Sequence, residues 1–153
     1  MLKFADYDIV FQEVPDETAL ALNLTHCPHR CEGCHSPQLR EDIGEELTES
    51  ALDLLLMRYP CVTCVALMGG DADHKAVYAI ARYIHTKGKK VAWYTGDTAL
   101  PSDFPMAEFD FVKVGPYIEA LGGLKSPNTN QRFYHIQNNR LIDETYRFWN
   151  QSR

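Results

Sequence analysis

The sequence predicts an α/β fold with a mainly parallel sheet, on two observations. Short apolar segments typical of buried strands alternate with segments whose apolar residues recur at helical spacing, a pattern typical of parallel βαβ units. The length of 153 residues suits one hydrophobic core, whereas a complete eight-unit βα barrel needs about 250 residues. We therefore expect a single domain over residues 1–153 that forms a partial (incomplete) βα barrel.

The first predicted strand and helix lie in the amino-terminal third of the chain. Residues 18–24, TALALNL, form an apolar run that ends in a Thr-His-Cys-Pro turn. A helix follows, with Thr48 placed to cap its amino end and Pro60 placed to stop it. Its buried face is predicted from an apolar stripe at helical spacing, made of Leu52, Leu55, Leu56 and Tyr59.

The middle of the chain repeats this order of strand and helix. Residues 62–68 read as a second buried strand, and the glycine-rich turn 69–71 follows directly. A second helix is predicted over about 74–87, with Gly88 suited to a left-handed carboxyl-terminal cap. Residues 90–95 then form a third strand, closed by a glycine.

The carboxyl-terminal third is predicted to add strands but no further long helix. Residues 101–109 are rich in turn formers, and 109–114, FDFVKV, resume the composition of a strand. Residues 133–137 and 140–146 flank the pair Asn138-Asn139, which tolerates the positive backbone angles of a tight turn. We therefore expect a β-hairpin at the end of the chain.

Charge and hydropathy exclude several classes of function. The chain has 15 lysines and arginines against 21 aspartates and glutamates, so its formal charge of −6 disfavours nucleic-acid binding. Acidic residues interrupt the apolar residues at the amino terminus, so no signal peptide is predicted. No apolar run is long enough to cross a bilayer. We therefore expect a cytoplasmic protein that binds neither nucleic acid nor membrane.

Three of the five cysteines are clustered, with the spacing C-x3-C-x2-C formed by Cys27, Cys31 and Cys34. In a reducing cytoplasm, such a cluster indicates a metal site rather than disulfides. A structural zinc ion takes four ligands, and an electron-transferring [4Fe–4S] cluster takes four cysteines. Three thiolates on a [4Fe–4S] cluster leave one iron open for a ligand that is not protein.

Zinc is the alternative occupant of this site, since His26, His29 or His35 could complete a four-ligand set. The protein would then be a zinc-binding interaction module without catalysis. Cys61 and Cys64 form a separate C-x2-C pair. Because residues three apart on a strand face opposite sides, we interpret both as small core residues rather than as a second metal site.

The motifs around these cysteines resemble those of radical S-adenosylmethionine enzymes. The cysteine triad follows a strand, and a Gly-Gly-Asp turn ends the next strand. Within that superfamily, the chain from about Ile9 to Trp149 is similar to the activating protein of anaerobic ribonucleoside-triphosphate reductase. The motifs that carry the resemblance are CPHRCEGC at 27–34, MGGD at 68–71, WYTG at 93–96, FVKVGPY at 111–117 and NTNQR at 128–132.

The resemblance implies a [4Fe–4S] cluster on the three cysteines and S-adenosylmethionine bound beside it. The reduced cluster would cleave this cofactor, and the resulting radical would take a hydrogen from a glycine of the reductase, the protein substrate. It also implies a low-potential electron donor such as flavodoxin or ferredoxin. The residues expected at the cofactor are Gly33, Cys34, His35, Gly69, Gly70 and Asp71, with Thr95 near the ribose.

The glycines of the turn are expected to let the backbone approach the cofactor without a side chain in the way. The chain departs from the family at three positions. His26 and Asp16 stand where the family often has glycine, and Ala72 stands where it often has proline. Activation of another glycyl-radical enzyme, or radical chemistry on a small molecule, is the nearest alternative function.

Overall fold

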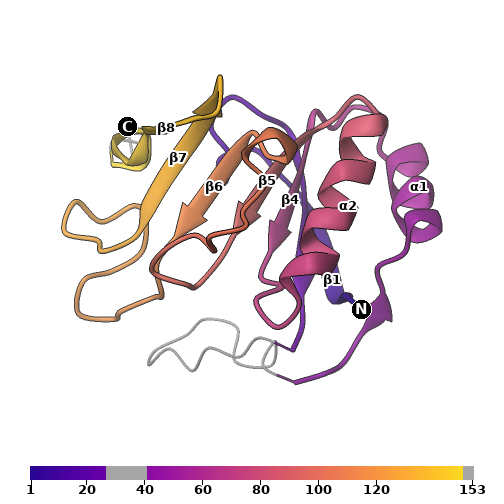
Figure 1. Ribbon diagram of the computed structural model, residues 1–153, viewed down its shortest axis with the longest axis horizontal. Helices are drawn as coiled ribbons and strands as arrows, with labels where there is room; N and C mark the ends of the chain where they lie inside the picture. The colour runs from indigo at the N-terminus through magenta and orange to yellow at the C-terminus, as the bar shows by residue number, and fades with distance from the viewer. Residues whose placement is uncertain (27–40, 150–153) are drawn as a thin grey trace.

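The computed structural model describes residues 1–26 and 41–149, which form one eight-stranded sheet with two α-helices (Figure 1). The helices are α1 (Glu49–Arg58) and α2 (His74–Thr86), and short 3₁₀ helices span Met106–Glu108 and Thr145–Phe148. Across the sheet, the strands lie in the order β3 (Glu45–Glu46), β1 (Lys3–Val10), β2 (Ala19–Leu24), β4 (Cys64–Met68), β5 (Lys90–Tyr94), β6 (Phe111–Val114), β7 (Arg132–Gln137) and β8 (Arg140–Asp143).

The sheet is mixed, with a parallel centre and antiparallel edges. Strands β2, β4, β5 and β6 run parallel, and the register places Leu22 beside Leu67 and Leu67 beside Trp93. The pairs at the two edges, β3–β1–β2 and β6–β7–β8, are antiparallel. This open arrangement confirms the predicted α/β fold, its parallel sheet at the centre and its carboxyl-terminal hairpin.

Local signals placed the helices and the hairpin correctly. The Thr48 hydroxyl accepts a hydrogen bond from the amide of Ala51 at 3.0 Å, as expected of a cap on α1. The carboxylate of Asp73 caps helix α2 in the same way, and this cap was not predicted from the sequence. In the hairpin, Asn138 and Asn139 have φ angles of 51° and 60°, the left-handed geometry of a two-residue turn.

Strands β1 and β3 were not predicted. In β1 only Phe4 is buried, and acidic residues interrupt the apolar pattern that would indicate a strand. The strand forms because its backbone pairs with β2 on one side and with β3 on the other, with Tyr7 opposite Leu22. This pairing leaves little trace in hydropathy, because β1 lies near the edge of the sheet and most of its side chains are not buried.

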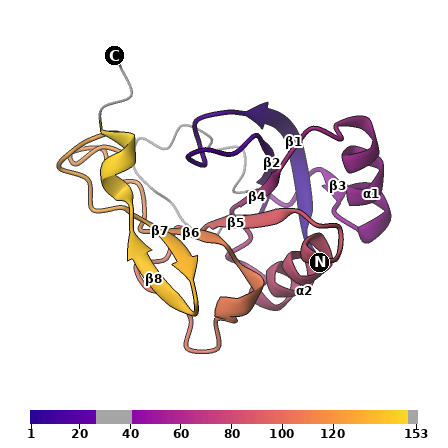
Figure 2. The ribbon, with the colours of Figure 1, turned by 90° about the horizontal axis from the view of Figure 1, so that it is seen from above.

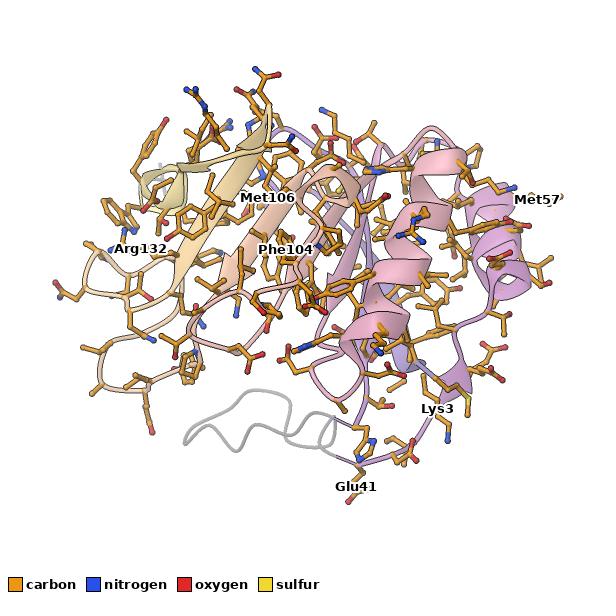
Figure 3. The ribbon with its side chains drawn as sticks, in the orientation of Figure 1. Lys3, Glu41, Met57, Phe104, Met106 and Arg132 are labelled. Atoms are coloured by element: carbon orange, nitrogen blue, oxygen red, sulfur yellow. The ribbon has the colours of Figure 1, made fainter. Side chains whose placement is uncertain are left out.

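The two faces of the parallel strands differ in the size of their side chains. Large residues such as Leu22, Leu67 and Trp93 face α1 and α2, and form the main core with them. Phe104, labelled in Figure 3, lies on this side, and its ring stacks on that of Trp93 with 6.0 Å between ring centres. The opposite face carries smaller side chains, namely Ala19, Ala21, Cys64, Ala66 and Ala92.

We call the face with small side chains the inner face. Figure 2 shows that both α-helices lie on the other side of the sheet, whereas the 3₁₀ helix Thr145–Phe148 lies on the inner side. Phe111, Phe133 and Phe148 fill the inner face near β6 and β7. Among the described residues, no helix is long and apolar enough to cross a membrane.

Candidate functional site

A cavity of about 560 Å³ opens on the inner face, at the carboxyl ends of the parallel strands. This volume lies within the usual range of ligand pockets. Met68, Tyr94 and Lys113 line it from the ends of β4, β5 and β6, whose arrowheads point the same way in Figure 1. The rest of its wall comes from the connections before β2 and after β6 and from the last 3₁₀ helix, through Gln12, Glu13, Tyr117, Gly123, Leu124, Lys125, Gln131 and Phe148.

Lys113 brings a positive charge to the wall of the cavity. Its ammonium donates hydrogen bonds to the carbonyl oxygens of Thr95, at 2.9 Å, and Gly115, at 3.1 Å. Lys113 was not among the site residues predicted from the sequence. A signal was present, because Lys113 shares its face of β6 with Phe111 and interrupts an otherwise apolar strand.

Tyr94 joins the cavity to the connection that precedes β2. Its hydroxyl donates a hydrogen bond to the carbonyl oxygen of Glu13. Desolvation raises the pKa of this phenol well above its ordinary value. Tyr94 therefore acts as a neutral hydrogen-bond donor that fastens this part of the wall, and it is unsuited to serve as a base at neutral pH.

The predicted cofactor turn, residues 69–71, is tied closely to β5. The amide of Gly69 donates to the carbonyl of Tyr94 at 2.9 Å, and the indole of Trp93 donates to the carbonyl of Gly69 at 2.7 Å. A β-carbon added at Gly70, where φ is 89°, would lie 2.6 Å from a methyl of Val77. The absence of a side chain at Gly70 therefore lets α2 pack closely against the turn, and it does not leave open space for a ligand.

Asp71 and Thr95 lie together at the ends of β4 and β5. The side chain of Asp71 is 2% exposed. Its Oδ1 accepts a hydrogen bond from the Thr95 hydroxyl, and its Oδ2 accepts one from the amide of Gly96 at 2.9 Å. The Thr95 hydroxyl, expected near the ribose, thus donates to Asp71 and also accepts from the amide of Asp97 at 3.1 Å.

His74 lies beside this pair, at the start of α2. Its Nε2 is 3.4 Å from an oxygen of Asp97 and 3.8 Å from Oδ1 of Asp71. Within the described ranges, this is the one group of three metal-binding side chains whose ligand atoms lie within 4.8 Å of one another. Both Asp71 oxygens already accept hydrogen bonds, from Thr95 and from Gly96. These bonds explain the position of the carboxylate without a metal ion.

The predicted cluster ligands Cys27, Cys31 and Cys34, together with Gly33 and His35, lie outside the described residues. The other two cysteines are described. Cys64 is buried in β4, as predicted, but Cys61 is exposed in the turn before that strand, so its assignment to the core was wrong. Cys61 precedes both the predicted strand, 62–68, and the observed one, which begins at Cys64, and therefore lies on no strand face. Burial raises the pKa of the Cys64 thiol strongly, which makes it a poor metal ligand.

Two departures from the family pattern keep the backbone geometry of glycine. Asp16 and His26, which stand where the family often has glycine, have φ angles of 67° and 59°. Few residues with side chains adopt this left-handed region. Asp16 gains an ion pair with Arg147 of the last 3₁₀ helix, and the amide of His26 donates to the carbonyl of Glu41 at 2.8 Å.

Comparison with known protein families assigns the chain to a class. Residues 18–113, more than half of the sequence, match the model of the 4Fe-4S single cluster domain. The chain belongs to this family. This 4Fe-4S domain is typical of radical S-adenosylmethionine activases, and its matched range includes the cysteine triad. The searches of curated proteins and of solved structures returned no match.

Proposed function

We propose that this protein is a radical S-adenosylmethionine activase that generates a glycyl radical on anaerobic ribonucleoside-triphosphate reductase. The observation that carries the proposal is the match to a 4Fe-4S single cluster domain over a segment whose clustered cysteines number three, not four. Cys27, Cys31 and Cys34 would hold the cluster and leave one iron open to the cofactor. The order of the motifs along the chain, which resembles that of the reductase-activating protein, supports anaerobic ribonucleoside-triphosphate reductase as the substrate.

The cavity on the inner face fits S-adenosylmethionine in size and in chemistry. Its volume of about 560 Å³ accommodates a ligand of this size. Lys113 places a cation where a carboxylate could bind, and Met68 and Tyr94 offer apolar surface to the rest of the molecule. When both are bound, the cluster and S-adenosylmethionine supply one-electron cleavage of the sulfonium and hydrogen abstraction from a carbon.

The residues of the chain itself position the reactants and exclude water. Phe111, Phe133 and Phe148 form a continuous aromatic group on the inner face, with Phe133 5.1 Å from Phe148 and 5.8 Å from Phe111 between ring centres. Phe148 lines the cavity and the other two pack behind it, and an apolar wall of this kind keeps solvent from a reactive carbon radical. Tyr94 fastens the connection before β2 through Glu13, and so holds one side of the cavity in place.

Exposed apolar residues on the segments around the cavity support a protein as the substrate. Phe11 is 69% exposed and precedes two residues that line the cavity. Ile118 and Leu121, on the connection after β6, are 41% and 36% exposed. Apolar side chains at the mouth of a site favour a macromolecular partner that covers them on binding. A low-potential donor such as flavodoxin or ferredoxin would supply the electron.

Deuterium transfer tests the proposed function. Anaerobic reductase with deuterium at the α-carbons of its glycines is mixed with the reconstituted, reduced protein and S-adenosylmethionine. We expect a protein radical in the electron paramagnetic resonance spectrum and deuterium in the 5′-deoxyadenosine formed. The Cys31→Ala variant, which lacks one cluster thiolate, is the control and should bind less iron and form neither product.

Three outcomes would contradict the proposal in different ways. Stoichiometric zinc, with no iron–sulfur chromophore after reconstitution, would favour the non-catalytic zinc module. Formation of 5′-deoxyadenosine that carries no deuterium, with no protein radical in the spectrum, would indicate a small-molecule substrate. Radical formation on a different glycyl-radical enzyme, but not on the reductase, would keep the chemistry and change the target.

A further inference from the structure

The turns after β4 and β5 are joined by a buried hydrogen-bonded clamp, made of Asp71, Thr95 and Gly96. We propose that this clamp is the positioning element of the cofactor site, with Asp71 and Thr95 acting through the turn they hold rather than by contact with the cofactor. The inference rests on the proposed function, because it assigns a role in binding S-adenosylmethionine.

The clamp uses both oxygens of Asp71. Thr95, with no exposed surface, donates its hydroxyl to Oδ1, and the amide of Gly96 donates to Oδ2 at 2.9 Å. Replacing Asp71 or Thr95 by a residue that cannot make these bonds leaves a buried polar group without its hydrogen bond, which is costly. The carboxylate therefore holds the turn after β4 against the turn after β5 at two points.

The turn after β4 depends on such an external restraint. Gly69 and Gly70 both have positive φ angles, 112° and 89°, in a region where glycine has much conformational freedom. Neither glycine has a side chain with which to anchor the backbone. Hydrogen bonds with Tyr94 and Trp93 hold the backbone of Gly69, and the side chain of Asp71 holds the far end of the turn beyond Gly70.

The clamp is also connected to the charged wall of the cavity. The carbonyl of Thr95 accepts the hydrogen bond from the Lys113 ammonium at 2.9 Å, and the amide of Thr95 donates to the carbonyl of Lys113. Thr95 thus holds Asp71 through its side chain and Lys113 through its backbone. A shift of Thr95 would displace the turn and the cation together, so it should change cofactor affinity as well as stability.

A tyrosine–aspartate pair between the two helices gives a control. The hydroxyl of Tyr83 in α2 donates to Oδ1 of Asp53 in α1 at 2.8 Å. Neither residue lines the cavity or belongs to the turns after β4 and β5. Tyr83→Phe therefore removes a side-chain hydrogen bond between elements on the other side of the sheet.

The test measures S-adenosylmethionine binding to reconstituted full-length protein by anaerobic titration, with iron content and thermal midpoint measured on the same samples. We expect Thr95→Val and Asp71→Asn to weaken binding about tenfold at full iron content, since one lost buried hydrogen bond is worth that much. Thr95→Ser, which keeps the hydroxyl, should bind within about twofold of the wild type. Tyr83→Phe should lower the thermal midpoint without weakening binding.

Wild-type affinity in a fully loaded Thr95→Val variant would overturn the inference. Equal loss of affinity in Tyr83→Phe would also overturn it, because the effect would then follow stability alone. If Thr95→Val does not fold, Asp71→Asn decides the question by the same criteria. If the wild type carries a full cluster and binds no S-adenosylmethionine, the proposed function fails, and this inference fails with it.

Discussion

Asp16 and His26 show that residues with side chains can hold a left-handed backbone in this fold. Both have the positive φ angles that favour glycine. At Asp16 the ion pair with Arg147 offsets part of the backbone cost. The two departures therefore change the side chains at these positions while retaining the left-handed backbone.

Cys64 leads to a prediction about pH. Its pKa is raised in the folded protein, chiefly by burial, from an ordinary value of 9.0. Above about pH 9, the unfolded chain therefore releases a proton that the folded protein keeps, and stability falls as pH rises, by up to about 1.4 kcal/mol per pH unit. Below that pH, neither state loses the proton and the contribution is constant.

Urea unfolding of the cluster-free protein between pH 7 and pH 10 measures this effect as a difference between the wild type and Cys64→Ala. The variant should be less stable at pH 7 and should lose less stability at alkaline pH. Cys61→Ala, at an exposed position, should retain the wild-type slope. Equal slopes in the wild type and Cys64→Ala would contradict the raised pKa.

At the scale of elements, sequence reasoning succeeded where the signals were local. The Thr48 cap and the Asn138-Asn139 turn depend on residues close in the chain. Strand β1 was missed because its partner β2 supplies the order that its own composition does not. The link between Asp71 and Thr95 was missed for the same reason, because the two residues are 24 positions apart and meet only when β4 and β5 pair.

The site could be predicted only as far as its motifs. The turn 69–71 and the residue Thr95 were placed at the strand ends, where the structure brings them together. Their mutual hydrogen bond was not foreseen, and neither was the role of Lys113 in the cavity wall. Motifs specify which segments approach a ligand, whereas the direction of each side chain depends on the neighbouring strands.

Packing of the glycine turn against α2 predicts the effect of a substitution at Gly70. Gly70→Ala should destabilise the protein by about 2 to 4 kcal/mol, because the new methyl overlaps Val77 and the positive φ is strained. Val77→Ala alone should cost about 2 kcal/mol through the cavity it leaves. Denaturant unfolding of the double variant should show a loss smaller than the sum, whereas strict additivity would mean that the two positions do not interact.

At the scale of the whole molecule, the contrast between the two faces of the sheet decides where a ligand can bind. The helices bury the large side chains of one face, and the small side chains of the other leave room above the strand ends. The apolar runs predicted the strands, but they did not predict which face would remain open. That depended on the placement of both α-helices on the same side (Figure 2).

A graded pair of substitutions at Gly123 tests whether this open space is the cofactor site. A β-carbon at Gly123 would meet its nearest neighbour, a side-chain oxygen of Gln131, at 3.6 Å, an ordinary contact. Gly123→Ala should therefore bind S-adenosylmethionine within about twofold of the wild type, whereas Gly123→Leu should fill part of the cavity and weaken binding about tenfold or more. Anaerobic titration measures both, and a thermal midpoint controls for folding. Unchanged binding in Gly123→Leu would place the cofactor elsewhere.

The wall of the cavity has a consequence for the order of folding. The carbonyl of Glu13 accepts a hydrogen bond from Tyr94, 81 residues away, and the carboxylate of Asp16 accepts one from Arg147, 131 residues away. By contrast, α2 packs on the strands next to it in the chain. Contacts that close long loops must overcome more chain entropy before they form. The sheet and its helices can therefore assemble while the inner face is still open. The wall closes late in folding, and the same long-range contacts are the ones whose local opening would expose the inner face again.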